Sequence, residues 1–330
     1  MQYVLKKEVF EDFVRAVMGS FDFIAPVRGD PSKRVQKSRF TTISSPKDIV
    51  TLPASTYFSA KGFFFDKKET LFTFDGNNLE NPVLDIPPRV LFGLRKCDLN
   101  GISHQDIVFL ENTTPDPFYK ARRDATLLIG LHCESGDEFC FCNSIGLKEF
   151  HDLMFFDLDD VYAVEVGSEK GKYFLKQFSS FFQEQDGVIK PSDRETINTL
   201  TLNTQDIKKF FHHSGWQELA DTCISCGSCN LLCPNCHCAT IKDEVGFDLK
   251  SGKRVRIPAS CQLKSFTRVA GEHIFRNERV ERYKHRIYHQ LQYFKERHDT
   301  QFCTGCGRCI RGCPVKINWV NKINEMESGN

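Results

Sequence analysis

Residues 1–200 mix helical and strand-like hydrophobic patterns. Apolar side chains recur at helical spacing over 9–17 and are followed by Gly19, which predicts a short amphipathic helix. The segments 89–94 and 126–131 are short, continuous and apolar. Runs of this length suit strands that are buried on both faces of an α/β sheet.

Two hairpins are expected in the same region. Apolar stretches over 62–65 and 71–74 flank one polar turn, and apolar stretches over 154–156 and 161–166 flank another. Strand-forming residues on both sides of a short polar segment are typical of antiparallel hairpins.

The last third of the chain is patterned as helices. Apolar positions over 207–219 suggest one helix, and those over 280–294 recur every three to four residues in a charged background. The second pattern predicts a single amphipathic helix with an apolar seam. We place a domain boundary in the polar stretch between these regions, which gives an N-terminal domain of residues 1–200 and a C-terminal domain of residues 201–330.

The overall charge excludes several classes of partner. The 330 residues contain 44 Lys and Arg against 43 Asp and Glu, a formal charge of +1. This balance favours neither nucleic acid nor an anionic membrane. The first residues do not resemble a signal peptide, and no apolar run reaches the roughly 18 residues of a membrane span. We therefore expect a cytoplasmic protein with no membrane partner.

Cysteine usage makes metal binding the main question. The chain has 15 cysteines, an odd number that argues against a framework of disulfides. Cytoplasmic thiols stay reduced unless a metal holds them.

Two cysteine runs repeat one motif. Residues 223–234 and 303–314 each have the spacing C-x2-C-x2-C-x3-C-P. This is the bacterial ferredoxin-type pattern for 4Fe–4S clusters, in which the fourth cysteine of each run reaches the other cluster. The alternative is structural zinc, but a zinc site needs neither the third cysteine nor the final proline.

The crossed pattern assigns ligands to two clusters. The first set is Cys223, Cys226, Cys229 and Cys313, and the second set is Cys233, Cys303, Cys306 and Cys309.

The two runs are separated by about seventy residues that include the amphipathic helix. A compact βαββαβ ferredoxin has no room for such an insertion. The predicted fold class is therefore α+β, with an N-terminal α/β mixed-sheet domain followed by a C-terminal all-helical ferredoxin-like domain.

The N-terminal domain contains a further set, Cys97, Cys133, Cys140 and Cys142. Two members follow predicted strands, where open α/β sheets bind their ligands. Four thiolates can complete a third cluster, whereas free buried cysteines would act as small hydrophobic residues. The spacing leaves both interpretations open.

Three more cysteines, Cys236, Cys238 and Cys261, follow the first run. They can be alternative ligands, a redox-active thiol site or packing residues, and packing is the simplest expectation. The chain has no G-x-G-x-x-G, P-loop or H-E-x-x-H motif. Any flavin or nicotinamide chemistry is thus expected on a partner.

Several segments together carry a family resemblance: 92–99, 116–123, 140–143, 223–238 and 270–276. On these segments the chain resembles the β subunit of cytoplasmic NiFe sulfhydrogenases and the A subunit of anaerobic sulfite reductase, a family of dicluster iron–sulfur proteins. The resemblance covers nearly the whole chain.

The resemblance implies a third 4Fe–4S cluster on the N-terminal set, in addition to the two of the ferredoxin runs. It also implies a diaphorase partner that carries FAD and binds NAD(P), and a separate catalytic subunit. This chain would then relay electrons and contribute no catalytic residue. A hydrogenase-type partner is favoured. The alternatives are a sulfite reductase A-type subunit and a subunit with its own redox-active thiols.

Overall fold

The computed structural model describes residues 2–29, 37–52 and 54–329. The chain forms two compact units, each made of separate stretches of sequence. Unit 1 contains Met1–Ala60, Ile86–Thr201 and Thr304–Arg308, and unit 2 contains Lys61–Asp85, Leu202–Cys303 and Cys309–Asn330.

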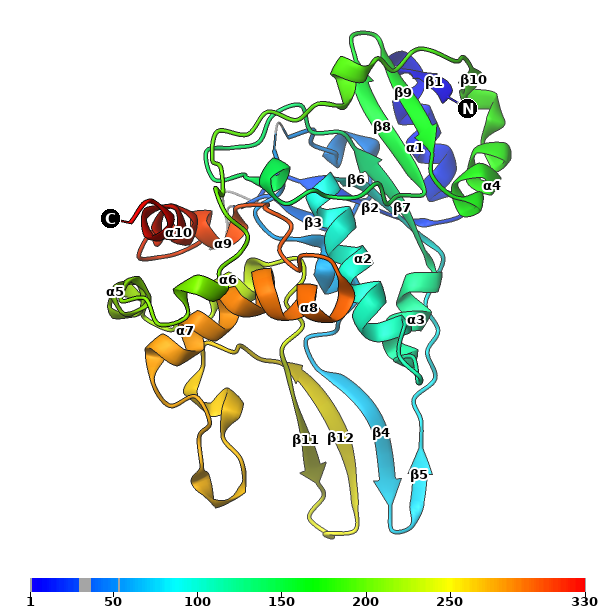
Figure 1. The fold of residues 1–330 in the computed structure, drawn as a ribbon. Helices are drawn as coiled ribbons and strands as arrows, with labels where there is room; N and C mark the ends of the chain where they lie inside the picture. Colours follow the sequence, from blue (N-terminus) through cyan, green and yellow to red (C-terminus); the bar gives the residue numbers. More distant parts are fainter. Residues whose placement is uncertain (1, 30–36, 53, 330) are drawn as a thin grey trace. The chain divides into compact units, whose positions relative to one another are not determined.

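Unit 1 is built on an eight-stranded sheet in its described residues, with the strand order β10-β1-β9-β8-β7-β6-β2-β3 (Figure 1). The pairs β2–β6, β6–β7 and β7–β8 are parallel, and the other neighbours are antiparallel. The strands are β1 (Gln2–Lys6), β2 (Asp22–Val27), β3 (Arg39–Thr42), β6 (Arg89–Leu94), β7 (Thr126–Leu131), β8 (Leu153–Leu158), β9 (Val161–Val166) and β10 (Gln183–Glu184).

Helices cover both faces of this sheet. The main core joins one face to α1 (Phe10–Met18) and α4 (Glu169–Gln177), with Phe13 and Phe174 fully or almost fully buried. The helices α2 (Lys96–Leu110) and α3 (Pro117–Asp124) pack against β6 and β7. Burial on both sides explains why these two central strands are continuously apolar.

The structure confirms most of the elements predicted for this unit. The helix over 9–17 is α1, the buried segments 89–94 and 126–131 are β6 and β7, and the hairpin over 154–166 is β8–β9. The hairpin predicted over 62–74 is wrong. Residues Ala60–Phe63 form a 3-10 helix instead, and the actual hairpin joins β4 (Glu69–Asp75) to β5 (Asn78–Glu80).

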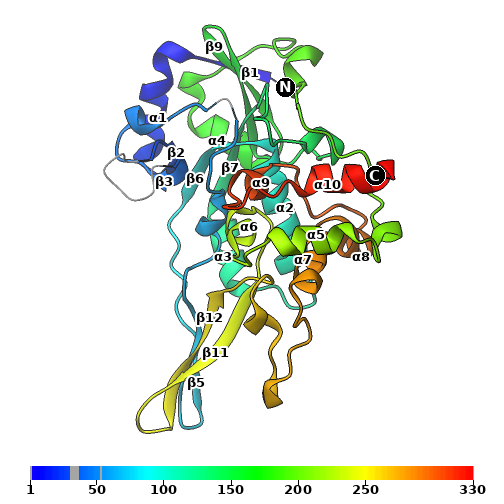
Figure 2. The same ribbon diagram turned by 90° about the vertical axis from the view of Figure 1, so that its left-hand side faces the viewer.

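Unit 2 contains a four-stranded antiparallel sheet, in the order β11-β12-β4-β5, within the described part of the chain (Figure 1, and turned by 90° in Figure 2). The prediction of an all-helical C-terminal domain is therefore wrong. The strands β11 (Ala239–Val245) and β12 (Ser251–Pro258) form a hairpin, which then pairs with β4. The chain is thus a mixed α/β protein with a sheet in each unit.

The helices of unit 2 flank its cysteine runs along the chain. The predicted helix over 280–294 is confirmed as α7, which continues through a π-helical segment at His289–Tyr293 into α8. The α-helices are α5 (Gly215–Thr222), α6 (Ser228–Leu232), α7 (Arg279–Tyr288), α8 (Phe294–His298) and α10 (Trp319–Ser328), and α9 (Arg308–Arg311) begins at the last residue of unit 1. Further 3-10 helices are Lys7–Val9, Pro46–Asp48, Cys142–Ser144, Ser179–Phe181, Pro191–Arg194, Lys208–Phe210, Lys264–Thr267 and Ala270–Glu272.

Candidate metal centres

Two cysteines of unit 1 lie at the carboxyl ends of neighbouring parallel strands. Strand β6 ends at Leu94, and Cys97 lies in the first turn of the helix α2 that follows. Strand β7 ends at Leu131, two residues before Cys133. Because β6 and β7 are paired in parallel, their carboxyl ends meet at one edge of the sheet, where open α/β sheets bind ligands.

A cavity of about 270 Å³ lies at this edge. Its lining includes all four cysteines of the N-terminal set and a fifth cysteine from the second ferredoxin run. These residues are Cys97, Cys133, Cys140, Cys142 and Cys306. Spacing along the chain does not predict Cys306 here, because its motif matches a separate cluster.

Two glycines allow the segment with Cys306 to reach this cavity. Gly305 and Gly307 have φ angles of +65° and +67°, which favour glycine. A Cβ atom on Gly305 would lie 2.5 Å from the Cα atom of Cys142, and one on Gly307 would lie 2.4 Å from the backbone oxygen of Phe139. The backbone N–H of Phe141 donates to the oxygen of Gly305 at 2.8 Å. The close approach therefore depends on both glycines.

The cavity combines thiols with positive charge. Arg95, Lys96 and Arg194 are among its lining residues. Burial raises the pKa of the Cys97 thiol, and the neighbouring Asp98 carboxylate adds to this effect. A group that binds thiolates must therefore supply enough energy to remove this proton. The soft sulfur donors and the cationic rim fit an anionic iron–sulfur cluster.

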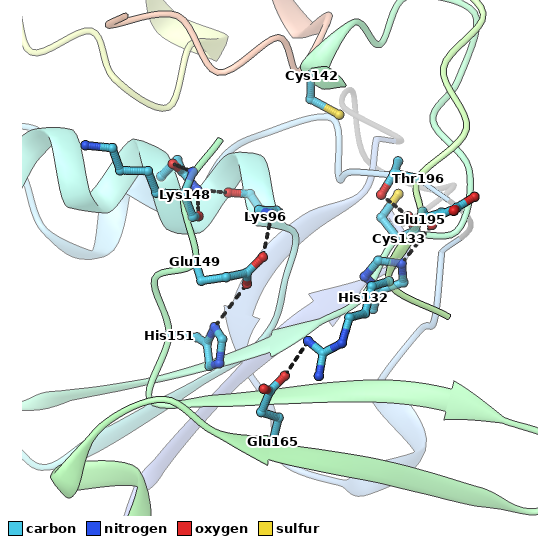
Figure 3. Close-up of polar contacts among 12 residues, drawn as sticks. Lys96, His132, Cys133, Cys142, Lys148, Glu149, His151, Glu165, Glu195 and Thr196 are labelled. Atoms are coloured by element: carbon cyan, nitrogen blue, oxygen red, sulfur yellow. Dashed lines mark hydrogen bonds and ion pairs between the residues drawn. The ribbon is translucent and has the colours of Figure 1, made fainter. Parts of the chain in front are cut away.

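Polar contacts surround these cysteines, and Figure 3 shows those of Thr196 and Lys96. The hydroxyl of Thr196 donates to the backbone oxygen of Cys133 at 2.7 Å. Lys96 forms an ion pair with Glu149. The thiol of Cys142 is 3.3 Å from the side-chain oxygen of Asn198. The contacts of Thr196 and Asn198 tie Cys133 and Cys142 to neighbouring loops.

A buried ion pair lies beside the same cavity. The guanidinium of Arg308 is fully buried and lies 2.9 Å from both carboxylate oxygens of Asp98. It also donates to the backbone oxygen of Thr56 at 2.8 Å. In the sequence, Asp98 directly follows Cys97, and Arg308 lies two positions after Cys306. Charge pattern alone could not reveal this pair, since its members are 210 residues apart.

The second cavity, in unit 2, gathers the first predicted ligand set. Its lining cysteines are Cys223, Cys226, Cys229, Cys309 and Cys313. Four of these are the predicted set, and Cys309 is an addition. The cavity measures only about 30 Å³, so the fit to a cluster rests on the donors rather than on the space. Five soft thiols in one place fit an iron–sulfur cluster or another thiophilic metal.

Tight turns position this first run. Helix α5 ends at Thr222, after which Ser225 adopts a φ of +54° and Gly227 a φ of +79°. The backbone N–H of Ser225 donates to the sulfur of Cys223 at 3.4 Å. Burial raises the pKa of Cys229 to about 12, the neighbouring Arg286 partly opposing this rise.

The four cysteines of the second predicted set lie in different surroundings. Cys306 lines the cavity of unit 1, and Cys309 lines the small cavity of unit 2, where the indole N–H of Trp319 donates to its sulfur at 3.3 Å. Cys233 is hydrogen-bonded to Cys236. The backbone N–H of Cys303 donates to the oxygen of Gln290.

A third group of thiols lies in unit 2. Cys233 is hydrogen-bonded to Cys236, and Cys238 to Cys261. Within each pair the shared proton lowers the pKa of one thiol, Cys233 and Cys261 respectively, and raises that of its partner. The amide of Asn230 lies against three of the four sulfurs. The signal for this group in the sequence is the close spacing of Cys233, Cys236 and Cys238.

In the described residues, no three His, Cys, Asp or Glu side chains already surround one metal position. No helix in the same residues is long and apolar enough to span a membrane.

Comparison with known proteins gives two matches. The 4Fe–4S dicluster domain family matches residues 222–317, which include both ferredoxin-type runs. Over its full length the chain is 30% identical to sulfhydrogenase 2 subunit beta of Pyrococcus furiosus, and the alignment covers 99% of that protein. No solved structure matches the chain.

Proposed function

Because the chain belongs to the sulfhydrogenase β-subunit family and is an iron–sulfur electron-transfer subunit, we propose that it relays electrons between two partners. One is a diaphorase subunit that carries FAD and binds NAD(P). The other is a catalytic subunit of the hydrogenase type. The observation that carries this proposal is the similarity to a sulfhydrogenase β subunit along the whole chain.

The cysteine sets supply the positions for the clusters. We assign one 4Fe–4S cluster to the first set, Cys223, Cys226, Cys229 and Cys313, and another to the N-terminal set, Cys97, Cys133, Cys140 and Cys142. The ferredoxin spacing assigns a further cluster to Cys233, Cys303, Cys306 and Cys309. Each bound cluster would supply reversible one-electron oxidation and reduction.

The chain's own residues prepare each position for this chemistry. In unit 1, Arg95 and Lys96 bring positive charge to the rim of the thiol cavity. In unit 2, the indole of Trp319 and the backbone N–H of Ser225 donate to cysteine sulfurs. Hydrogen bonds to sulfur and burial set the reduction potential of iron–sulfur sites, so these contacts are the means by which the protein tunes a relay.

Anaerobic purification of the chain with its native partners tests the proposal. We expect the complex to contain iron and acid-labile sulfide, a flavin on another subunit, and hydrogenase activity coupled to NAD(P). A complex with sulfite reductase activity would refute the hydrogenase assignment. Zinc without sulfide would refute the electron-transfer function itself.

A further inference from the structure

We propose that Cys233, Cys236, Cys238 and Cys261 together bind an iron–sulfur cluster inside unit 2. This inference rests on the proposed electron-transfer function. It assigns a role as ligands to Cys236, Cys238 and Cys261, the cysteines of unit 2 outside the ferredoxin runs, and it moves Cys233 from the spacing-based set into a different one.

Three of the four thiols meet at one amide. The side-chain nitrogen of Asn230 lies 3.6 Å from the sulfur of Cys236, 3.8 Å from that of Cys238 and 3.3 Å from that of Cys261. Cys233 joins the group through its hydrogen bond with Cys236. Asn230 is itself held, because Ser260 donates to its side-chain oxygen at 2.9 Å.

Two further amides point at the same sulfurs. The side chain of Gln290 donates to Cys236 at 3.5 Å, and that of Gln262 lies 3.9 Å from Cys261. All three amide side chains are buried, with exposed fractions of 1–3%. A neutral thiol is a weak acceptor, whereas a metal-bound thiolate or sulfide makes full use of N–H donors. Simple packing would be served better by apolar neighbours.

The positive charge around the four thiols also favours a bound anion. Arg286 is 3% exposed, and its Nε atom has no hydrogen-bond partner in the described residues. The ammonium group of Lys61 donates to the backbone oxygens of Asn230 and Cys236, at 2.6 and 3.1 Å. Neither cation forms an ion pair with a carboxylate in the described part of the chain. Burying an unpaired charge is costly, and an anionic cluster would offset that cost.

The position of Arg286 favours a redox cluster over structural zinc. One guanidinium nitrogen donates to the backbone oxygen of Cys229, a member of the first ligand set, at 3.3 Å. The same guanidinium therefore lies between the first set and the four-thiol group. A second one-electron centre beside the first extends a relay, whereas zinc has no redox chemistry.

Serine variants of the full chain, purified anaerobically with its partners, test this assignment. We expect Cys261→Ser and Cys238→Ser each to lose about four irons per chain, with the matching sulfide, because one 4Fe–4S cluster is lost. Cys303→Ser, which removes a member of the spacing-based set only, is compared in the same assay. The opposite pattern, loss in Cys303→Ser with full iron in Cys261→Ser, would support the spacing-based set and overturn our proposal.

A second variant keeps every thiol, so its result does not depend on the loss of a ligand or on misfolding that such a loss can cause. Asn230→Leu removes the amide that donates to three sulfurs, and we expect it to lower the reduction potential of one cluster in an EPR-monitored titration while the others stay unchanged. An unchanged set of potentials would contradict the proposal, as would one zinc per chain that Cys261→Ser removes. Failure of the proposed function looks different, since the wild-type complex would then contain no iron.

Discussion

Replacing Arg308 by leucine is expected to destabilise unit 1 severely. The guanidinium is fully buried, and two of its nitrogens lie 2.9 Å from the carboxylate oxygens of Asp98. It also makes two hydrogen bonds to Thr56. The leucine variant leaves the Asp98 carboxylate, itself 2% exposed, without its cation.

The size of the effect follows from this burial. Removing one partner of a buried ion pair costs about 3–5 kcal/mol in the free energy of unfolding, because the remaining charge is uncompensated. Replacing both partners by apolar residues is often close to neutral. The double variant Arg308→Leu with Asp98→Leu should therefore recover most of the loss.

Urea unfolding of the holoprotein under anaerobic conditions measures these differences. With a denaturant dependence of about 3 kcal/mol per molar, Arg308→Leu lowers the midpoint by about 1–2 M. The matched control is Asp243→Asn, which breaks an exposed ion pair with Arg254 whose side chains are 40% and 44% exposed. Solvent screening leaves such an exposed pair with little effect on stability.

Two outcomes would refute the reasoning. One is a midpoint shift in Arg308→Leu no larger than that in Asp243→Asn. The other is a double variant no more stable than Arg308→Leu, which would show that the lost stability comes from packing around residue 308 rather than from an uncompensated Asp98 carboxylate.

Three further predictions concern the same sites. Gly305→Ala places a Cβ atom 2.5 Å from the Cα atom of Cys142, so it should cost more stability in urea unfolding than Gly76→Ala, where φ is also positive but the surrounding space is open. Burial lowers the pKa of His289 to about 4, so the unfolded chain binds this proton first and the free energy of unfolding falls as the pH drops from about 6.5 to 4. His289→Gln should flatten that part of the profile, measured by urea unfolding at each pH. Cys97→Ser should remove about four irons per chain while the iron of unit 2 remains, as judged by iron and sulfide analysis.

Local patterns were sufficient for the centre of unit 1. Continuous apolar runs identified β6 and β7, because a strand buried on both faces leaves no polar positions. Their parallel pairing then placed Cys97 and Cys133 at one edge of the sheet. Here a local signal and a general rule of α/β folds were enough to place half of the N-terminal set.

The sheet of unit 2 could not be predicted in the same way. Strand β4 pairs with β12 across more than 170 residues, and its contacts include an ion pair between Glu69 and Arg256 and the packing of Arg254 over the ring of Phe72. Such pairing depends on side chains that meet only in the folded chain. Hydrophobic periodicity describes neighbours in sequence, so it cannot predict that β12 pairs with β4.

The two ferredoxin-type runs show why spacing alone does not assign ligands. In the first run, Gly227 packs against Ser260, and the three leading cysteines line one cavity within unit 2. In the second run, Gly305 and Gly307 instead pack closely on the backbone of unit 1, so Cys306 lines the cavity there. Identical spacing thus leads to different neighbours. The surroundings of the glycines beside Cys226 and Cys306 determine which cavity each cysteine lines. Cys233 of the first run is hydrogen-bonded to Cys236, so we group it with the thiols around Asn230 and not with the set that spacing assigns.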